Sequence, residues 1–178
     1  YILPLVKIFI SRGAVPSLEA DSRWLKHVAR ALRALCVDDD CADYCQSIGV
    51  LAKCNVLLKE QHVPFDSSTA AILMLMQRLF GCPTCRDNLS DVGGAAPLLS
   101  IISRCSSMAK VKSAALRACA TLAEDPSWAE CLVAEKSVPL FVMHFVEAAH
   151  RGDGFHMHVC CHILRELAEG SPRAAVPI

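Results

Sequence analysis

Apolar residues recur at three- and four-residue spacing along most of the chain, which is the period of an amphipathic helix. In the segment 22–37 the apolar stripe consists of Leu25, Val28, Ala29, Leu32, Leu35 and Cys36. The same pattern predicts helices at 3–12, 41–48, 49–61, 67–80, 83–92, 96–104, 108–123, 126–136, 139–150 and 155–168. Glycines, prolines and acidic residues separate these segments, and none shows the alternation of a strand. The sequence therefore predicts an all-α protein.

Several of the predicted helices open with a similar apolar motif, and the motif returns at a nearly constant interval. Equivalent positions are Pro4, Leu51, Pro97 and Pro139, which are 47, 46 and 42 residues apart. This period is typical of stacked helical repeats, which cover their apolar faces with neighbouring repeats. We expect one array divided near 1–37, 38–81, 82–124, 125–170 and 171–178. The outermost units look partial, so we expect a fragment of a longer chain.

The composition narrows the class further. Hydrophobic residues make up 53% of the sequence and aromatic residues 6%, which favours an aliphatic core of closely packed helices. The 18 Lys and Arg residues balance 18 Asp and Glu residues, so no net charge attracts nucleic acid. No apolar stretch approaches the roughly 20 residues that a membrane span needs. The eleven cysteines lie mostly at apolar helical positions, which predicts reduced thiols in a reducing, cytoplasmic compartment.

The helices combine into groups of a short helix, a middle helix and a long helix. One middle helix opens with Gly-x-x-Pro, at 94–97, and the long helices end in related apolar motifs at 31–36, 75–80, 118–123 and 163–168. In this order and these motifs the chain resembles the armadillo-repeat family. The resemblance implies a right-handed α-solenoid of about four three-helix repeats, with the long helices lining a concave groove. Two-helix HEAT arrays are the alternative, but the short helices at 41–48, 83–92 and 126–136 favour the armadillo form.

Members of that family that hold extended basic peptides carry a ladder of Asn on the long helices, with Trp one turn earlier. The Asn side chain suits this role because its amide can both donate to and accept from a peptide backbone. The positions matching the Asn hold Ala34, Arg78, Thr121 and Glu166, and those matching the Trp hold Arg30, Met74, Arg117 and His162. A nuclear-import type of peptide clamp is therefore not expected.

Basic residues take the place of this ladder on the long helices. The residues we expect to contact a partner in the groove are Arg23, Lys26, Arg30, Arg78, Lys110 and Arg117. Acidic residues gather instead in short helices and turns, such as the run 38–40. This segregation favours an acidic, extended segment of a partner protein. The alternative is that these cations only solvate an exposed helix face. Nucleic acid is not expected, because no aromatic residues interleave with the charges.

One motif could hold a metal. Cys82 and Cys85 form a CxxC, which is half of a zinc site or a thiol redox pair. His158 and His162 would share a helix face and could supply the other ligands, although their helix belongs to a later repeat. Ordinary structural thiols and histidines are the simpler interpretation, and we expect no cofactor. The sequence contains none of the common catalytic motifs, so we expect a non-enzymatic protein.

These features together predict a scaffold for protein–protein interaction. The alternative is a structural component permanently embedded in a large assembly, such as a cytoskeletal or ciliary complex. The mean hydropathy of +0.36 favours that alternative, because exposed apolar patches usually mark interfaces.

Overall fold

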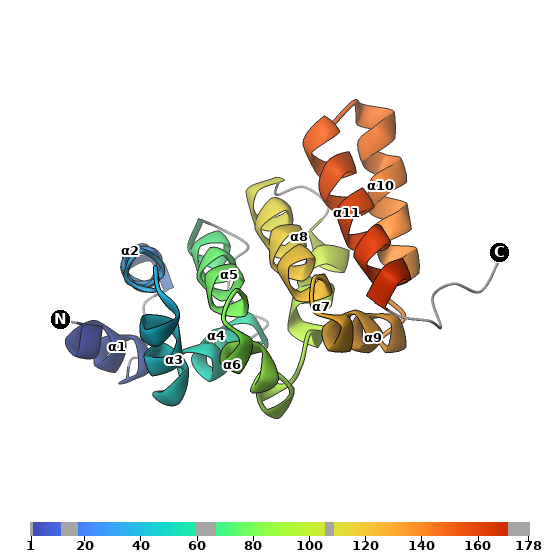
Figure 1. Ribbon diagram of the computed structural model, residues 1–178. Helices are drawn as coiled ribbons and strands as arrows, with labels where there is room; N and C mark the ends of the chain where they lie inside the picture. The colour runs from blue at the N-terminus through green and yellow to red at the C-terminus, as the bar shows by residue number, and fades with distance from the viewer. Residues whose placement is uncertain (1, 12–17, 60–66, 106–108, 171–178) are drawn as a thin grey trace.

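The computed structural model describes residues 2–11, 18–59, 67–105 and 109–170, and its assigned elements there are all helices (Figure 1). They are α1 (Ile2–Ser11), α2 (Leu18–Leu35), α3 (Asp39–Ser47), α4 (Val50–Lys59), α5 (Ser67–Phe80), α6 (Pro83–Asp87), η1 (Ser90–Val92), α7 (Ala96–Arg104), α8 (Ala109–Ala123), α9 (Pro126–Ala134), α10 (Val138–Arg151) and α11 (Gly154–Gly170). The all-α prediction is confirmed. Two expected helices differ, because 83–92 is split into α6 and the 3₁₀ helix η1, and the helix expected at 22–37 is α2, which begins at Leu18. The ends expected at 12, 61 and 108, and the unit 171–178, lie outside the described residues.

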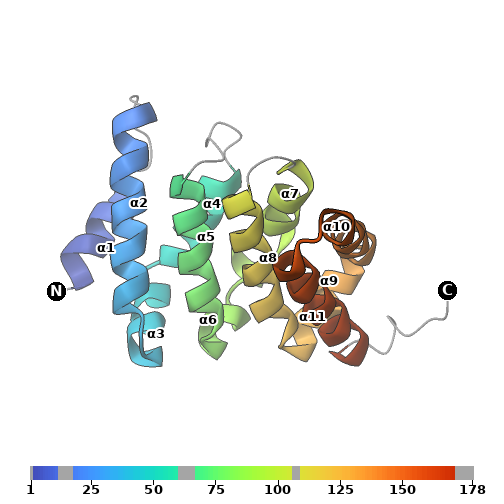
Figure 2. The ribbon, with the colours of Figure 1, turned by 90° about the horizontal axis from the view of Figure 1, so that it is seen from above.

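The helices form an α-solenoid in which successive groups lean on one another. Figure 2 shows the long helices α2, α5, α8 and α11 side by side. Helices α1, α4, α7 and α10 pack against α2, α5, α8 and α11, respectively. Helix α5 packs between α2 and α8, and α11 packs against α8. The short helices α3, α6 and α9 lie along one edge of the stack (Figure 2).

Position in the stack decides how much of a long helix is apolar. Helix α5 has a neighbour on each side and buries Ser68 to Leu73 without interruption, then Leu75, Met76, Leu79 and Phe80. Helix α11 is the last long helix and buries a single stripe of Val159, Cys160, Ile163 and Leu167. A helix flanked on both sides must be apolar nearly all round, whereas a terminal helix needs one apolar face. None of the described helices is both long enough and apolar enough to cross a bilayer.

The repeat period also appears in the polar contacts between groups. Side-chain hydrogen bonds between groups join residues 35 to 43 positions apart. One example is Trp128 Nε1 of α9, which donates to the Arg86 carbonyl of α6 at 3.2 Å. Each group therefore binds the next through equivalent positions.

All eleven cysteines lie in the described part of the chain and are free, and most are buried. Burial raises the pKa of Cys119 to about 12 and that of Cys160 to about 11. These thiols are protonated at neutral pH and pack as small apolar side chains. This agrees with the expectation of structural thiols.

Asp125 fixes the start of α9. Its Oδ1 accepts from the Ser127 backbone N–H at 3.0 Å, and its Oδ2 lies 3.2 Å from Arg86 Nε of the preceding group. Pro126 occupies the first helical turn, where a backbone N–H would have no partner in the helix. The hydrogen bonds from Ser127, with a smaller contribution from Arg86, lower the pKa of the Asp125 carboxyl.

We expect Asp125→Ala to lower the free energy of unfolding by about 0.5–2 kcal/mol at pH 7, because α9 loses its cap. The folded-state pKa of Asp125 is depressed, so its stabilisation is present above the unfolded-state value of about 3.9 and is lost as pH falls below it. Urea unfolding of both proteins should therefore show a difference at pH 7 that shrinks towards pH 3. Asp125→Asn, which keeps the cap acceptor and loses the charge, should fall between the two. A difference independent of pH would contradict the role of the carboxylate.

Candidate protein-binding groove

A groove of about 370 Å³ lies where α2, α5 and α8 run side by side. It is lined by Lys26, Arg30, Ser67, Ala70, Ala71, Met74, Lys110, Ser113, Ala114 and Arg117. The floor consists of small side chains and one methionine from α5 and α8. Long basic side chains from α2 and α8 form the two walls. The groove thus combines an apolar floor with cationic walls.

The lining residues just named include two lysines and two arginines and no carboxylate. Arg30, Lys110 and Arg117 are exposed, and Lys26 is half-buried. Like charges gathered on low-dielectric walls create a positive potential that attracts anions. Four of the six expected groove residues are therefore brought together, across two helices that are about 90 residues apart in sequence.

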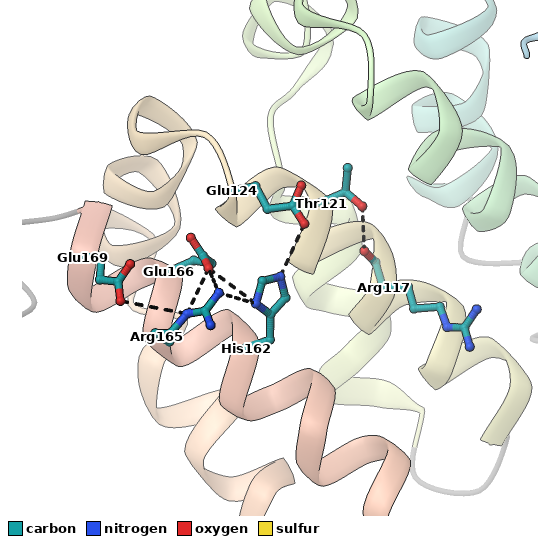
Figure 3. Close-up of polar contacts among 7 residues, drawn as sticks. All are labelled: Arg117, Thr121, Glu124, His162, Arg165, Glu166 and Glu169. Atoms are coloured by element: carbon teal, nitrogen blue, oxygen red, sulfur yellow. Dashed lines mark hydrogen bonds and ion pairs between the residues drawn. The ribbon is translucent and has the colours of Figure 1, made fainter. Parts of the chain in front are cut away.

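Arg117 is held at the α11 side of this groove. Its guanidinium carbon lies 4.7 Å from the centre of the Phe155 ring, a cation–π arrangement that leaves its hydrogen-bond donors free to bind an anion. Figure 3 shows the Arg117 side chain extending away from the polar network between α8 and α11.

The other two expected residues are placed differently. Arg23 is exposed on α2, one turn before Lys26, and extends the positive charge beyond the groove lining. Arg78 of α5 instead donates from Nε to the Cys36 carbonyl and from Nη2 to the Val37 carbonyl. These carbonyls follow the C-terminal end of α2, where the last turn leaves acceptors without helical partners. Arg78 therefore tethers α5 to α2 and does not line the groove.

The polar side chains at the positions that match the Asn ladder form hydrogen bonds with other residues of this chain. Arg78 holds the end of α2, and Thr121 Oγ1 donates to the Arg117 carbonyl at 3.2 Å. Glu166 accepts from Arg165 and lies 3.4 Å from His162 Nδ1. Of the positions one turn earlier, Arg30, Met74 and Arg117 line the groove, whereas His162 lies beside Glu124. This chain therefore has Arg30 and Arg117 at two of the positions that match the Trp, and it has no amide side chain at the positions that match the Asn.

The surface between α8 and α11 has a different character (Figure 3). His162 Nε2 lies 3.3 Å from Glu124 Oε1, and Arg165 pairs with Glu166 and, at 3.9 Å, with Glu169. The hydrogen bond from Arg165 lowers the pKa of the Glu166 carboxyl. Acidic and basic side chains pair with one another here, whereas the residues that line the α2–α5–α8 groove carry four cations and no carboxylate.

The metal candidates do not meet as the sequence suggested. His162 contacts Glu124 and Glu166, and His158 is exposed on the same helix, α11, away from the CxxC. Cys82 and Cys85 lie instead beside Asp43 of α3, and the three ligand atoms are all within 4.8 Å of one another. Asp43 precedes Cys82 by 39 residues, close to one repeat period, which is the signal that could have identified it.

Ser113, at the groove, forms a hydrogen-bonded relay with two residues of the next group. Its Oγ lies 2.8 Å from His156 Nε2, and His156 Nδ1 lies 2.5 Å from Asp153 Oδ2. The other Asp153 oxygen accepts from the His156 backbone N–H at 3.1 Å, which caps the first turn of α11. Ser113 lies inside α8, whose backbone N–H groups are used by the helix. The relay fixes the start of α11 beside the groove.

Comparison with known proteins supports the fold. No model of a known protein family matches the chain, and no curated protein sequence matches it. Among solved structures it is similar to an engineered protein from the Northeast Structural Genomics Consortium, with a TM-score of 0.78 and 19% identity over 96% of this chain and 64% of the other. A designed armadillo repeat protein in complex with the peptide (KR)4 gives 0.77 and 15% identity over 96% and 66%. A second designed armadillo repeat protein gives 0.71 and 13% over 96% and 70%.

The chain therefore has the armadillo-like repeat fold, as its sequence motifs predicted. It spans less than two thirds of the length of the first of these structures. The fold is one that typically serves as a non-enzymatic scaffold for binding proteins.

We expect Arg78→Met to lower the free energy of unfolding by about 1–3 kcal/mol, because two carbonyls after α2 lose a charged donor. Arg78→Lys should recover part of the loss, since an ammonium cannot reach both acceptors with the same fork geometry. Arg151→Met, which removes an exposed charge at the end of α10, should change stability by less than about 0.5 kcal/mol. Urea unfolding measures all three, and equal effects of Arg78→Met and Arg151→Met would contradict the tether.

Proposed function

We propose that this chain is a non-enzymatic protein-binding scaffold whose α2–α5–α8 groove holds an acidic, extended segment of a partner protein. The proposal rests chiefly on one observation, the convergence of Lys26, Arg30, Lys110 and Arg117 around an apolar floor. Carboxylates of the segment pair with these cations, while its smaller apolar parts contact the floor. Arg23 adds attraction at the entrance.

The size of the groove fits a short segment. Neighbouring helix axes lie about 8–10 Å apart, so three helices span about 16–20 Å. An extended chain rises about 3.3 Å per residue, and five or six residues therefore cross the groove. Two acidic residues placed four or five positions apart could reach the α2 wall and the α8 wall together.

The charge of the groove argues for an acidic ligand. The designed armadillo repeat protein named above was crystallised with the basic peptide (KR)4. The present chain has cations at the groove and lacks free amides at the positions that match the Asn ladder. A basic peptide would meet repulsion here, so the charge preference should be inverted.

A labelled (DE)4 octapeptide tests the proposal, and (KR)4, a peptide of the same length and opposite charge, is the control. We expect (DE)4 to bind with an affinity that falls as salt rises, and (KR)4 not to bind. The double variant Arg30→Glu/Arg117→Glu should weaken (DE)4 binding by roughly tenfold or more, because exposed pairs contribute about 0.2–1 kcal/mol each and reversal adds repulsion. Fluorescence anisotropy measures each affinity.

A matched control changes the net charge by the same amount elsewhere. Lys7→Glu/Arg151→Glu reverses two exposed cations on α1 and α10, outside the groove helices. This control should leave (DE)4 binding within about twofold, and Arg78→Met should do the same. Equal weakening by both charge reversals would show nonspecific attraction and reject the groove as the binding site.

A second candidate function follows from the surface of α10. Val142, Met143 and Val146 are 44%, 47% and 44% exposed and lie within little more than one turn of that helix. Exposed apolar side chains in a group favour a permanent contact with another protein, as in a structural component of a large assembly. Replacing all three by Ser should leave (DE)4 binding unchanged and abolish any self-association seen by analytical ultracentrifugation.

A further inference from the structure

We infer that Asp43, Cys82 and Cys85 form a binding site for Zn²⁺ that joins α3 to α6. This site is independent of the groove and goes beyond the proposed scaffold function. Its three ligand atoms come from two successive helix groups and already lie within 4.8 Å of one another. The proposed ligands are two thiolates and one carboxylate, with water in the fourth position.

The local backbone presents both thiols in the same direction. Cys82 precedes α6 in an extended conformation and Pro83 opens the helix, so the chain turns sharply between the two cysteines. Two residues between cysteines is the spacing of half a zinc site. Cys82 and Cys85 are buried beneath α3, while Asp43, Pro83 and Thr84 are exposed and give an ion a route from solvent.

The distances require only a small adjustment. Zn–S bonds of about 2.3 Å and Zn–O bonds of about 2.1 Å place tetrahedral ligands about 3.6–3.8 Å apart. Cys82 Sγ now lies 2.9 Å from Asp43 Oδ1, to which it donates a hydrogen bond. A separation larger by roughly 0.7 Å accommodates the ion. Rotation of the exposed Asp43 side chain is sufficient for that change.

Asp43 is prepared for this role. Hydrogen bonds from Cys82 and Thr84 hold its carboxylate beside the two cysteines. The Thr84 hydroxyl donates to the same Asp43 oxygen and would orient the carboxylate when an ion replaces the thiol proton. The nearest arginine in α6 does not compete for Asp43, because Arg86 contacts the Phe80 carbonyl at 2.7 Å and Asp125 at 3.2 Å.

The ligand set selects the metal. Two thiolates favour Zn²⁺ over the hard cations Mg²⁺ and Ca²⁺, which take oxygen ligands. Cysteine binds Zn²⁺ as the thiolate, so binding of the ion is accompanied by release of protons. The bound ion would link α3 and α6 across the edge of the stack, where each short helix has few other contacts.

The test uses the reduced chain carrying Cys131→Ser/Cys161→Ser, which removes its two exposed thiols. Titration with Co²⁺ should give one equivalent of binding with thiolate-to-cobalt charge-transfer absorption, and Zn²⁺ should displace it. Cys82→Ser/Cys85→Ser should abolish the charge-transfer bands. His158→Gln/His162→Gln should leave them unchanged. Absence of these bands from the parent chain, or their persistence without Cys82 and Cys85, would overturn the site.

Substitutions at two exposed residues, Asp43 and Thr84, test the site even if the double cysteine variant does not fold. Asp43→Asn should weaken Zn²⁺ binding by at least about tenfold, and Thr84→Val by about 10–100-fold through loss of orientation of the carboxylate. Circular dichroism checks that both variants remain helical. An unchanged Zn²⁺ affinity in Asp43→Asn would reject the three-ligand site, whereas the expected loss supports it.

Discussion

Each helix group of this protein has apolar faces that only the neighbouring groups can cover, and the whole structure depends on this constraint. It explains why α5, with a neighbour on either side, is apolar almost all round, while α11 buries one stripe. It also explains why the polar contacts between groups recur at close to one period. The hydrogen bonds of Arg78 with Cys36, Trp128 with Arg86 and Ser113 with His156 each join residues 42 or 43 positions apart, so each links nearly equivalent positions of adjacent groups.

The stacking also creates the candidate site. Because the long helices lie side by side, residues on α2, α5 and α8 line one groove. Small side chains such as Ala70 and Ala114 keep the floor low, and the long basic chains then define the walls. Cations are tolerated there because their charged ends remain in solvent while their stems cover apolar surface. The acidic and basic side chains between α8 and α11 neutralise one another, which leaves the positive potential localised (Figure 3).

Residues of the same type make different contacts in this solenoid, depending on which groups of the neighbouring repeat lie beside them. Arg117 faces a phenyl ring and solvent, whereas Arg78 faces the free carbonyls after α2. Cys119 is enclosed by apolar side chains, whereas Cys82 has a carboxylate within hydrogen-bond distance. Each pair shares one chemistry, and the neighbouring group decides whether the side chain is used within the fold or lies at a proposed binding site.

The sequence by itself determined the helices, their period and the stacked architecture, because periodic apolar positions and turn residues are local signals. It also placed Lys26, Arg30, Lys110 and Arg117 on one side of the array, since these lie on corresponding faces of equivalent helices. Only the tertiary structure decided that Arg78 is used as a tether, that His158 and His162 lie apart from the CxxC, and that Asp43 lies beside it. These contacts depend on how far each helix group is shifted relative to the next. Side-chain packing between groups sets that shift, and the sequence pattern within a single group does not reveal it.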